Sequence, residues 1–148
     1  MYGWLIGVLL LLSGCHLGHP VAAVRYSPGP ITTAAAEPGL DAALRRSLTT
    51  SLSRRGALGE GSDVAITVLS AESRLVASGA GGVVYEARLS LSLSLAGPAP
   101  RRIVLAAQRS YSAAGPMDAS LARAAAFEAL ASELMSDAAD WLLLSGEP

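Results

Sequence analysis

The chain has 148 residues, of which 11 are basic and 12 are acidic, so its formal net charge is −1 at pH 7. A near-neutral chain lacks the basic surface that nucleic-acid binding needs, so we expect no nucleic-acid partner. Its only cysteine is Cys15, which excludes an internal disulfide. We therefore expect the hydrophobic core alone to stabilise the folded domain.

The N-terminus combines an apolar run, residues 4–12, with Ser13, Gly14 and Cys15. The run is shorter than the ~20 residues that span a bilayer, but it suits the hydrophobic region of a signal peptide. Small residues before a lone cysteine resemble a bacterial lipobox, where the cysteine is diacylated and the chain is cut just before it. We therefore expect a lipoprotein signal peptide at residues 1–14 and a lipidated Cys15.

Two other interpretations of this stretch remain open. It could be a short buried helix with an incidental cysteine, or a genuine membrane helix, although no second apolar run follows. The first four residues contain no Lys or Arg, whereas the start of a signal peptide is normally positive.

After the signal peptide, we expect a lipidated tether at residues 15–20, a single domain at residues 21–144 and a tail at residues 145–148. The 134 residues that remain after the first 14 are enough for one core. The patterns in the domain predict six elements in the order β-α-β-β-β-α. The expected strands are 21–26, 64–76, 83–95 and 101–111, and the expected helices are 38–55 and 118–144.

The first strand is predicted from the β-branched and apolar run 21–26, and the Pro-Gly-Pro stretch at 28–30 is expected to end it. Pro38 and Gly56 mark the two ends of the first helix. Its apolar stripe consists of Leu40, Ala43, Leu44, Leu48 and Leu52. The arginine pairs 45–46 and 54–55 lie off this stripe. We expect them to form a solvated surface and to match the dipole at the C-terminus of the helix, in preference to forming a ligand site.

The clearest strand, residues 83–95, alternates without a break. One face carries Tyr85, Ala87, Leu89, Leu91, Leu93 and Leu95, and the other carries Glu86, Arg88, Ser90, Ser92 and Ser94. Such alternation predicts a sheet with one buried face, and the serine row is either a ligand-facing surface or simply a polar one. In the last helix, Asp118 is the expected cap, and Leu121, Ala124, Ala125, Leu134, Met135, Ala138, Trp141 and Leu142 keep helical spacing.

These elements predict an α+β fold, in which a four-stranded, mostly antiparallel sheet has two helices packed on one face. The two histidines, His16 and His19, lie in the tether, so a Ser-His-Asp or Cys-His site would have no base inside the domain. The glycine-rich stretch 79–82 leads into a strand instead of the helix that a phosphate-binding fingerprint needs. We therefore expect no enzyme, no catalytic residue, no cofactor and no metal.

The order of these features resembles the family of LPS-assembly lipoproteins, LptE. The local matches are Pro38-Gly39-Leu40-Asp41-Ala42-Ala43-Leu44, Ser53-Arg54-Arg55-Gly56, Val84-Tyr85-Glu86-Ala87-Arg88-Leu89, Arg109-Ser110-Tyr111 and Ala124-Ala125-Ala126-Phe127-Glu128-Ala129-Leu130. Together these motifs cover most of the chain after the lipobox. The resemblance implies a lipid-anchored protein of the outer membrane that faces the periplasm. It also implies a plug and assembly partner for the β-barrel LptD, with binding of lipopolysaccharide.

The polar serine row and the scattered arginines would suit a barrel lumen, because lumens are polar. Our hypothesis is that Arg74, Arg88, Arg101 and Arg102 face LptD or lipopolysaccharide phosphates, since they lie on or beside the strands. Two alternatives remain: an auxiliary lipoprotein of an envelope ABC lipid transporter, and a lipoprotein regulator of cell-wall synthesis.

Overall fold

The computed structural model describes residues 24–33, 37–79, 82–97 and 99–145. The expected signal peptide at residues 1–14, the tether with Cys15 and nearly all of the expected tail lie outside the described residues.

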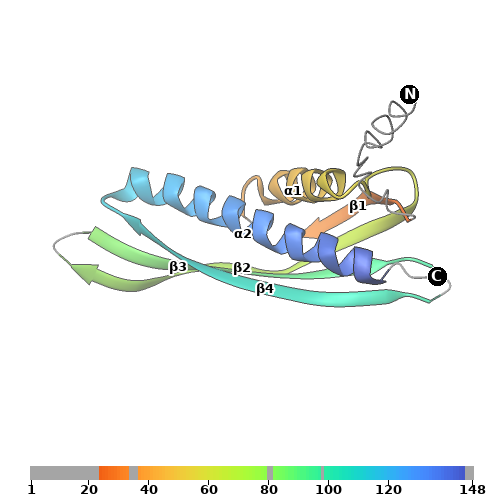
Figure 1. The fold of residues 1–148 in the computed structure, drawn as a ribbon. Helices are drawn as coiled ribbons and strands as arrows, with labels where there is room; N and C mark the ends of the chain where they lie inside the picture. Colours follow the sequence, from red (N-terminus) through yellow and green to blue (C-terminus); the bar gives the residue numbers. More distant parts are fainter. Residues whose placement is uncertain (1–23, 34–36, 80–81, 98, 146–148) are drawn as a thin grey trace, which may run out of the picture.

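Six elements follow one another in the predicted order, which confirms the α+β fold. They are β1 (Tyr26–Thr33), α1 (Leu40–Arg54), β2 (Ser62–Gly79), β3 (Gly82–Leu95), β4 (Arg101–Ala113) and α2 (Pro116–Ser145). The strands form one sheet in the order β1-β2-β3-β4, in which β1 is parallel to β2 and the other neighbours are antiparallel. Figure 1 shows both helices on the same side of the sheet, so the opposite face is left open.

The core lies between the sheet and the helices and is mostly aliphatic. Four of the six residues of β3 that the alternation predicts to be buried are buried, namely Ala87, Leu89, Leu91 and Leu93, each at most 1% exposed. The other two, Tyr85 and Leu95, are half-buried. The neighbours of the four buried residues in the core include Val64, Ile66 and Val68 of β2, Leu44, Leu48 and Leu52 of α1, and Leu130, Leu134, Met135 and Leu142 of α2. Because burying each large aliphatic side chain contributes about 1.5–3 kcal/mol, this layer supplies most of the stability.

The prediction for the first strand is wrong. β1 spans Tyr26–Thr33, so the Pro-Gly-Pro stretch at 28–30 lies inside the strand and does not end it. A proline is tolerated there because β1 is an edge strand, which needs hydrogen bonds on one side only. The register with β2 shifts at this stretch. Arg45 of α1 donates hydrogen bonds to the carbonyl oxygens of residues 28 and 29, each at 3.3 Å.

The first helix is confirmed, and Gly56 just beyond it has the positive φ of 68° that favours glycine. The second helix begins at Pro116, so Asp118 lies in its first turn and is not its cap. The stripe predicted for this helix is buried at Leu134, Met135, Ala138 and Leu142. Its first members are exposed, Leu121 by 72%, and the buried side of α2 begins at Ala126. The N-terminus of α1 meets α2 near Phe127, so the first turns of α2 extend past α1 (Figure 1).

The solvated surface predicted for the arginine pairs is confirmed for Arg45, Arg46 and Arg54, which are exposed. Arg46 and Arg55 also make contacts with α2. Arg46 pairs with Glu128 of α2 at 3.0 Å. Arg55 donates to Asp140 at 2.8 Å and to the Ser136 hydroxyl at 3.1 Å. These bonds connect the outer surfaces of the two helices, above the apolar layer.

A buried tyrosine connects the first strand to the end of the last helix. The Tyr26 hydroxyl donates a hydrogen bond of 2.8 Å to the carbonyl oxygen of Leu142. That carbonyl is among the last four of α2, which have no partner within the helix. Burial raises the pKa of Tyr26, and the nearby charge of Arg101 opposes this. The hydroxyl therefore stays protonated and able to donate at neutral pH.

We expect Tyr26→Phe to lower the free energy of unfolding by about 1–3 kcal/mol, because it leaves a buried carbonyl without its donor. Tyr85→Phe is the matched control, since the Tyr85 ring stacks on Tyr111 at 5.2 Å through its face and Phe keeps that contact. Urea denaturation of both variants measures the difference. Equal midpoints for the two variants would contradict this role.

Candidate functional site

The open face of the sheet carries mostly small and polar side chains in cross-strand rows, together with the exposed apolar Val84 and Val104. Ser92 lies between Thr67 of β2 and Val104 of β4. In the next row, Ser90 lies between Ser70 and Ala106. The serine row predicted on β3 thus forms the middle of this face.

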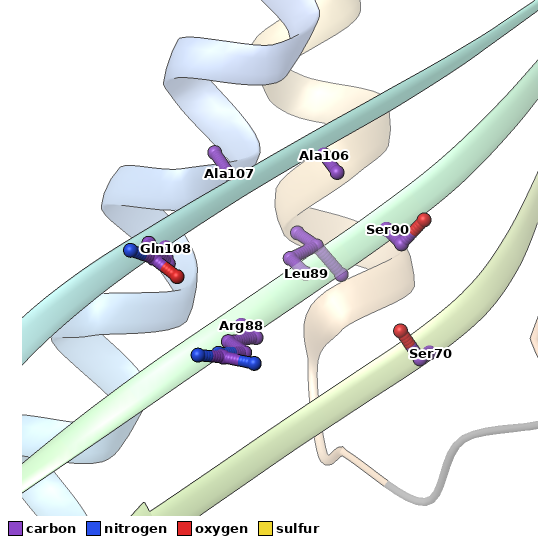
Figure 2. Close-up of a pocket in the computed structure, with 7 residues that line it drawn as sticks. All are labelled: Ser70, Arg88, Leu89, Ser90, Ala106, Ala107 and Gln108. Atoms are coloured by element: carbon purple, nitrogen blue, oxygen red, sulfur yellow. The ribbon is translucent and has the colours of Figure 1, made fainter.

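A shallow hollow of about 340 Å³ lies on this face. Its lining comes from three strands and consists of Ser70, Arg88, Leu89, Ser90, Ala106, Ala107 and Gln108. Figure 2 shows these residues on the three adjacent strands, with the helices behind the sheet. The hollow exists because serine and alanine side chains are short. It offers hydroxyls, one amide and one guanidinium, which are groups that bind polar ligands by hydrogen bonds.

One carboxylate holds two of the four predicted arginines. The Glu86 Oε1 atom accepts a 2.8 Å bond from Arg88 Nε and a 2.9 Å contact from Arg74 Nη2. The hydrogen bond from Arg88 is the main cause that lowers the pKa of Glu86, and the charge of Arg74 adds to it. The carboxylate therefore stays ionised and partly neutralises both arginines.

The other two predicted arginines lie far from this cluster. Arg102 is on the open face, where its Nε donates a 2.6 Å hydrogen bond to the hydroxyl of Ser92. Arg102 pairs with Ser94, eight residues along β3 from Glu86, or about 27 Å away at ~3.4 Å per residue. Arg101 is adjacent to Arg102 in β4 and so points to the opposite face, where its charge acts on Tyr26.

The structure thus brings Arg74 and Arg88 together and separates both from Arg101 and Arg102. Glu86 was recognised only as one member of the polar face of β3, and its role as the shared partner of two arginines was missed. Gln108 and Ser70 were missed as lining residues of the hollow. Nothing in the sequence around them indicates that they lie side by side, because the residues that meet across a sheet are determined by the register of its strands.

In the described ranges, no group of three or more His, Cys, Asp or Glu side chains is arranged to hold a metal ion. No helix within these same residues is long and apolar enough to cross a membrane. Among them, too, every buried side-chain nitrogen or oxygen has a hydrogen-bond partner.

The fold and the open face together define a class: a small two-layer α+β domain with its helices on one side and a polar sheet face exposed on the other. The family model described as "LptE: Lipopolysaccharide-assembly" matches residues 22–144. This protein therefore belongs to the LptE family. No curated protein matches the chain.

Solved structures share the fold. A protein from Caulobacter crescentus described as a lipoprotein is 23% identical, with a TM-score of 0.58 over 79% of this chain and 92% of that one. A DUF330 protein from Xanthomonas campestris is 19% identical, with a TM-score of 0.60 over 88% and 90%. A minor lipoprotein from Acinetobacter baumannii is 15% identical, with a TM-score of 0.53 over 84% and 99%. At these identities the likeness shows the fold alone.

We expect Glu86→Gln to make the free energy of unfolding depend less on pH in the acidic range. Because the arginines hold the folded-state pKa of Glu86 below its usual 4.5, the ionised carboxylate stabilises the fold above that pH. This contribution is lost as the pH falls through the lowered pKa. We expect the urea midpoint of the wild type to fall more steeply than that of the variant between pH 7 and about pH 3.

Glu133→Gln is the control, because Glu133 is an exposed carboxylate of α2 on the helix side of the sheet, away from the Arg74–Glu86–Arg88 cluster. It should keep the wild-type slope. If Glu86→Gln also keeps that slope, the cluster does not stabilise the folded state.

Proposed function

We propose that this protein is an outer-membrane lipoprotein, anchored through Cys15 and facing the periplasm. In this role it acts as plug and assembly partner of an LptD-type β-barrel in the transport of lipopolysaccharide to the outer membrane. The observation that carries the proposal is the family match, which covers the whole folded domain at residues 22–144. The proposed anchor rests on the sequence around Cys15.

The open face supports a position inside a barrel. Barrel lumens are polar, so the surface of a plug must be polar as well. On this face the basic Arg74, Arg88 and Arg102 are balanced by the acidic Asp63, Glu72 and Glu86. A face that is polar but balanced in charge fits a lumen wall of mixed charge without strong repulsion.

In this role the four predicted arginines contact the barrel or lipopolysaccharide phosphates. They form two groups on opposite faces of the sheet. Arg74, Arg88 and Arg102 share the open face, although Glu86 and Ser92 already bind their guanidinium groups. A phosphate would have to compete with these partners. Arg101 lies on the helix side near Tyr26, where it would serve a different part of the partner.

We expect the open-face variant Arg74→Gln/Arg88→Gln/Arg102→Gln to bind purified lipopolysaccharide in detergent at least about tenfold more weakly. The reason is that each lost charge-assisted hydrogen bond is worth ~1.5–3 kcal/mol before compensation. Arg101→Gln, the matched single change on the other face, should have a smaller effect. Unchanged binding by the triple variant, with an unchanged melting temperature, would exclude these residues as lipid contacts.

The partner is tested by affinity purification of the tagged, lipidated protein from detergent-solubilised envelopes, followed by mass spectrometry. We expect one large outer-membrane β-barrel in near-equal amount. Cys15→Ser is the control for the anchor: it should not incorporate labelled palmitate and should leave the membrane fraction. An inner-membrane permease with its ATPase would instead support the ABC-transporter alternative, and a cell-wall synthase would support the regulator alternative.

A further inference from the structure

Among the residues that the structure describes, the sheet has three stretches of strand edge with no neighbouring strand. They are the outer sides of β1 and β4, and the part of β2 beyond Val68, where its pairing with β1 ends. A free edge presents a row of N–H and C=O groups that can pair with another strand. Proteins usually prevent such pairing with prolines, bulges or charged side chains along the edge.

Two of the three stretches carry such features. β1 contains Pro28 and Pro30, and its register with β2 shifts in the same segment. The free part of β2 has two register shifts, one after Val68 and one after Leu75. Between them it carries Glu72 and Arg74, both exposed. Both stretches are therefore poor templates for another strand.

β4 carries none of these features along its centre. Its pairing with β3 runs without a shift through thirteen residue pairs, from Arg101 with Leu95 to Ala113 with Val83. It contains no proline, and its central stretch, 103–108, is uncharged. Val104 in that stretch is 56% exposed. A long, regular and uncharged edge is the geometry to which an extended segment adds as a further strand.

The charges at the ends of β4 indicate the chemistry of that segment. Arg101, Arg102 and Arg109 flank the uncharged centre, and β4 contains no acidic residue. If two copies of β4 paired antiparallel about Leu105, in the uncharged centre of the strand, Arg101 of each copy would lie opposite Arg109 of the other. Like charges directly opposite each other disfavour this pairing.

We propose that the outer edge of β4 binds an extended segment of a partner protein by strand addition, and that this segment carries acidic residues on both sides of a short apolar stretch. Main-chain hydrogen bonds supply the affinity, and the flanking arginines select the acidic ends. The proposal goes beyond the proposed function, because it does not require the partner to be a β-barrel.

The test is amide hydrogen exchange of the full chain in detergent, with and without a capped ten-residue peptide of alternating valine and threonine with one glutamate near each end. In the free protein, the amides of residues 101–113 that point away from β3 should exchange fast. At saturating peptide we expect their exchange to slow at least about tenfold. The free edge of β2, residues 69–79, should not change.

Three matched controls separate strand addition from other binding. Two versions of the peptide carry N-methyl groups on alternate residues, in the two possible phases, and only the phase that removes the donors facing β4 should abolish protection. A peptide with lysine in place of glutamate should not protect. Arg101→Gln/Arg109→Gln should weaken the protection, whereas Arg54→Gln in the last turn of α1 should not.

Several results would overturn the proposal. They are absence of protection at residues 101–113, equal protection by the lysine peptide, and protection by both N-methylated peptides, which would indicate docking through side chains. Protection of β4 that rises with protein concentration in the absence of peptide would mean that a second copy occupies the edge, and this also contradicts the proposal.

Discussion

The rest of the structure depends on a single apolar layer, which is buried between one face of the sheet and the two helices. With no internal disulfide, its leucine, isoleucine, valine and alanine side chains carry most of the stability. The layer lies on one side only, and the same strand, β3, supplies Leu89, Leu91 and Leu93 to the core and Ser90, Ser92 and Ser94 to the open face. On that face Ser92 is only 3% exposed and binds Arg102.

Much of the fold could be predicted because the spacing of apolar residues in the sequence matches the division of each strand and helix into a buried face and an exposed face. In the structure, the core of β3 alternates with the period of two, and the apolar stripe of α1 between Pro38 and Gly56 is buried. β1 was misplaced because a Pro-Gly-Pro stretch is normally a breaker, and the support that Arg45 gives its carbonyls comes from a later helix. Helical spacing in α2 could not show that its first turns have no second helix beside them.

The site was harder to predict, because it depends on register. In β2, Val64, Ile66 and Val68 face the core, and strict alternation from them would put Arg74 on the core side. The register shift after Val68 reverses the alternation, so Arg74 lies on the open face beside Glu86. Sequence alone gives the faces of Arg88 and Ser90 on their own strand, but it does not give a β-bulge or the residues that meet across it.

The hydrogen bond between Tyr26 and Leu142 lies at the end of the sheet where the first described residues enter the fold. The β2–β3 hairpin lies at the other end (Figure 1). Eighteen residues of β2 separate the two ends by roughly 55 Å at ~3.3 Å per residue. The length of the paired strands therefore sets the distance between the two ends of the sheet. How far the hairpin reaches from any attachment before Val24 is set by the number of residues in two paired strands. Within the regularly paired part of the strands, inserting two residues in each strand would lengthen the hairpin by about 7 Å and leave every side chain on its face.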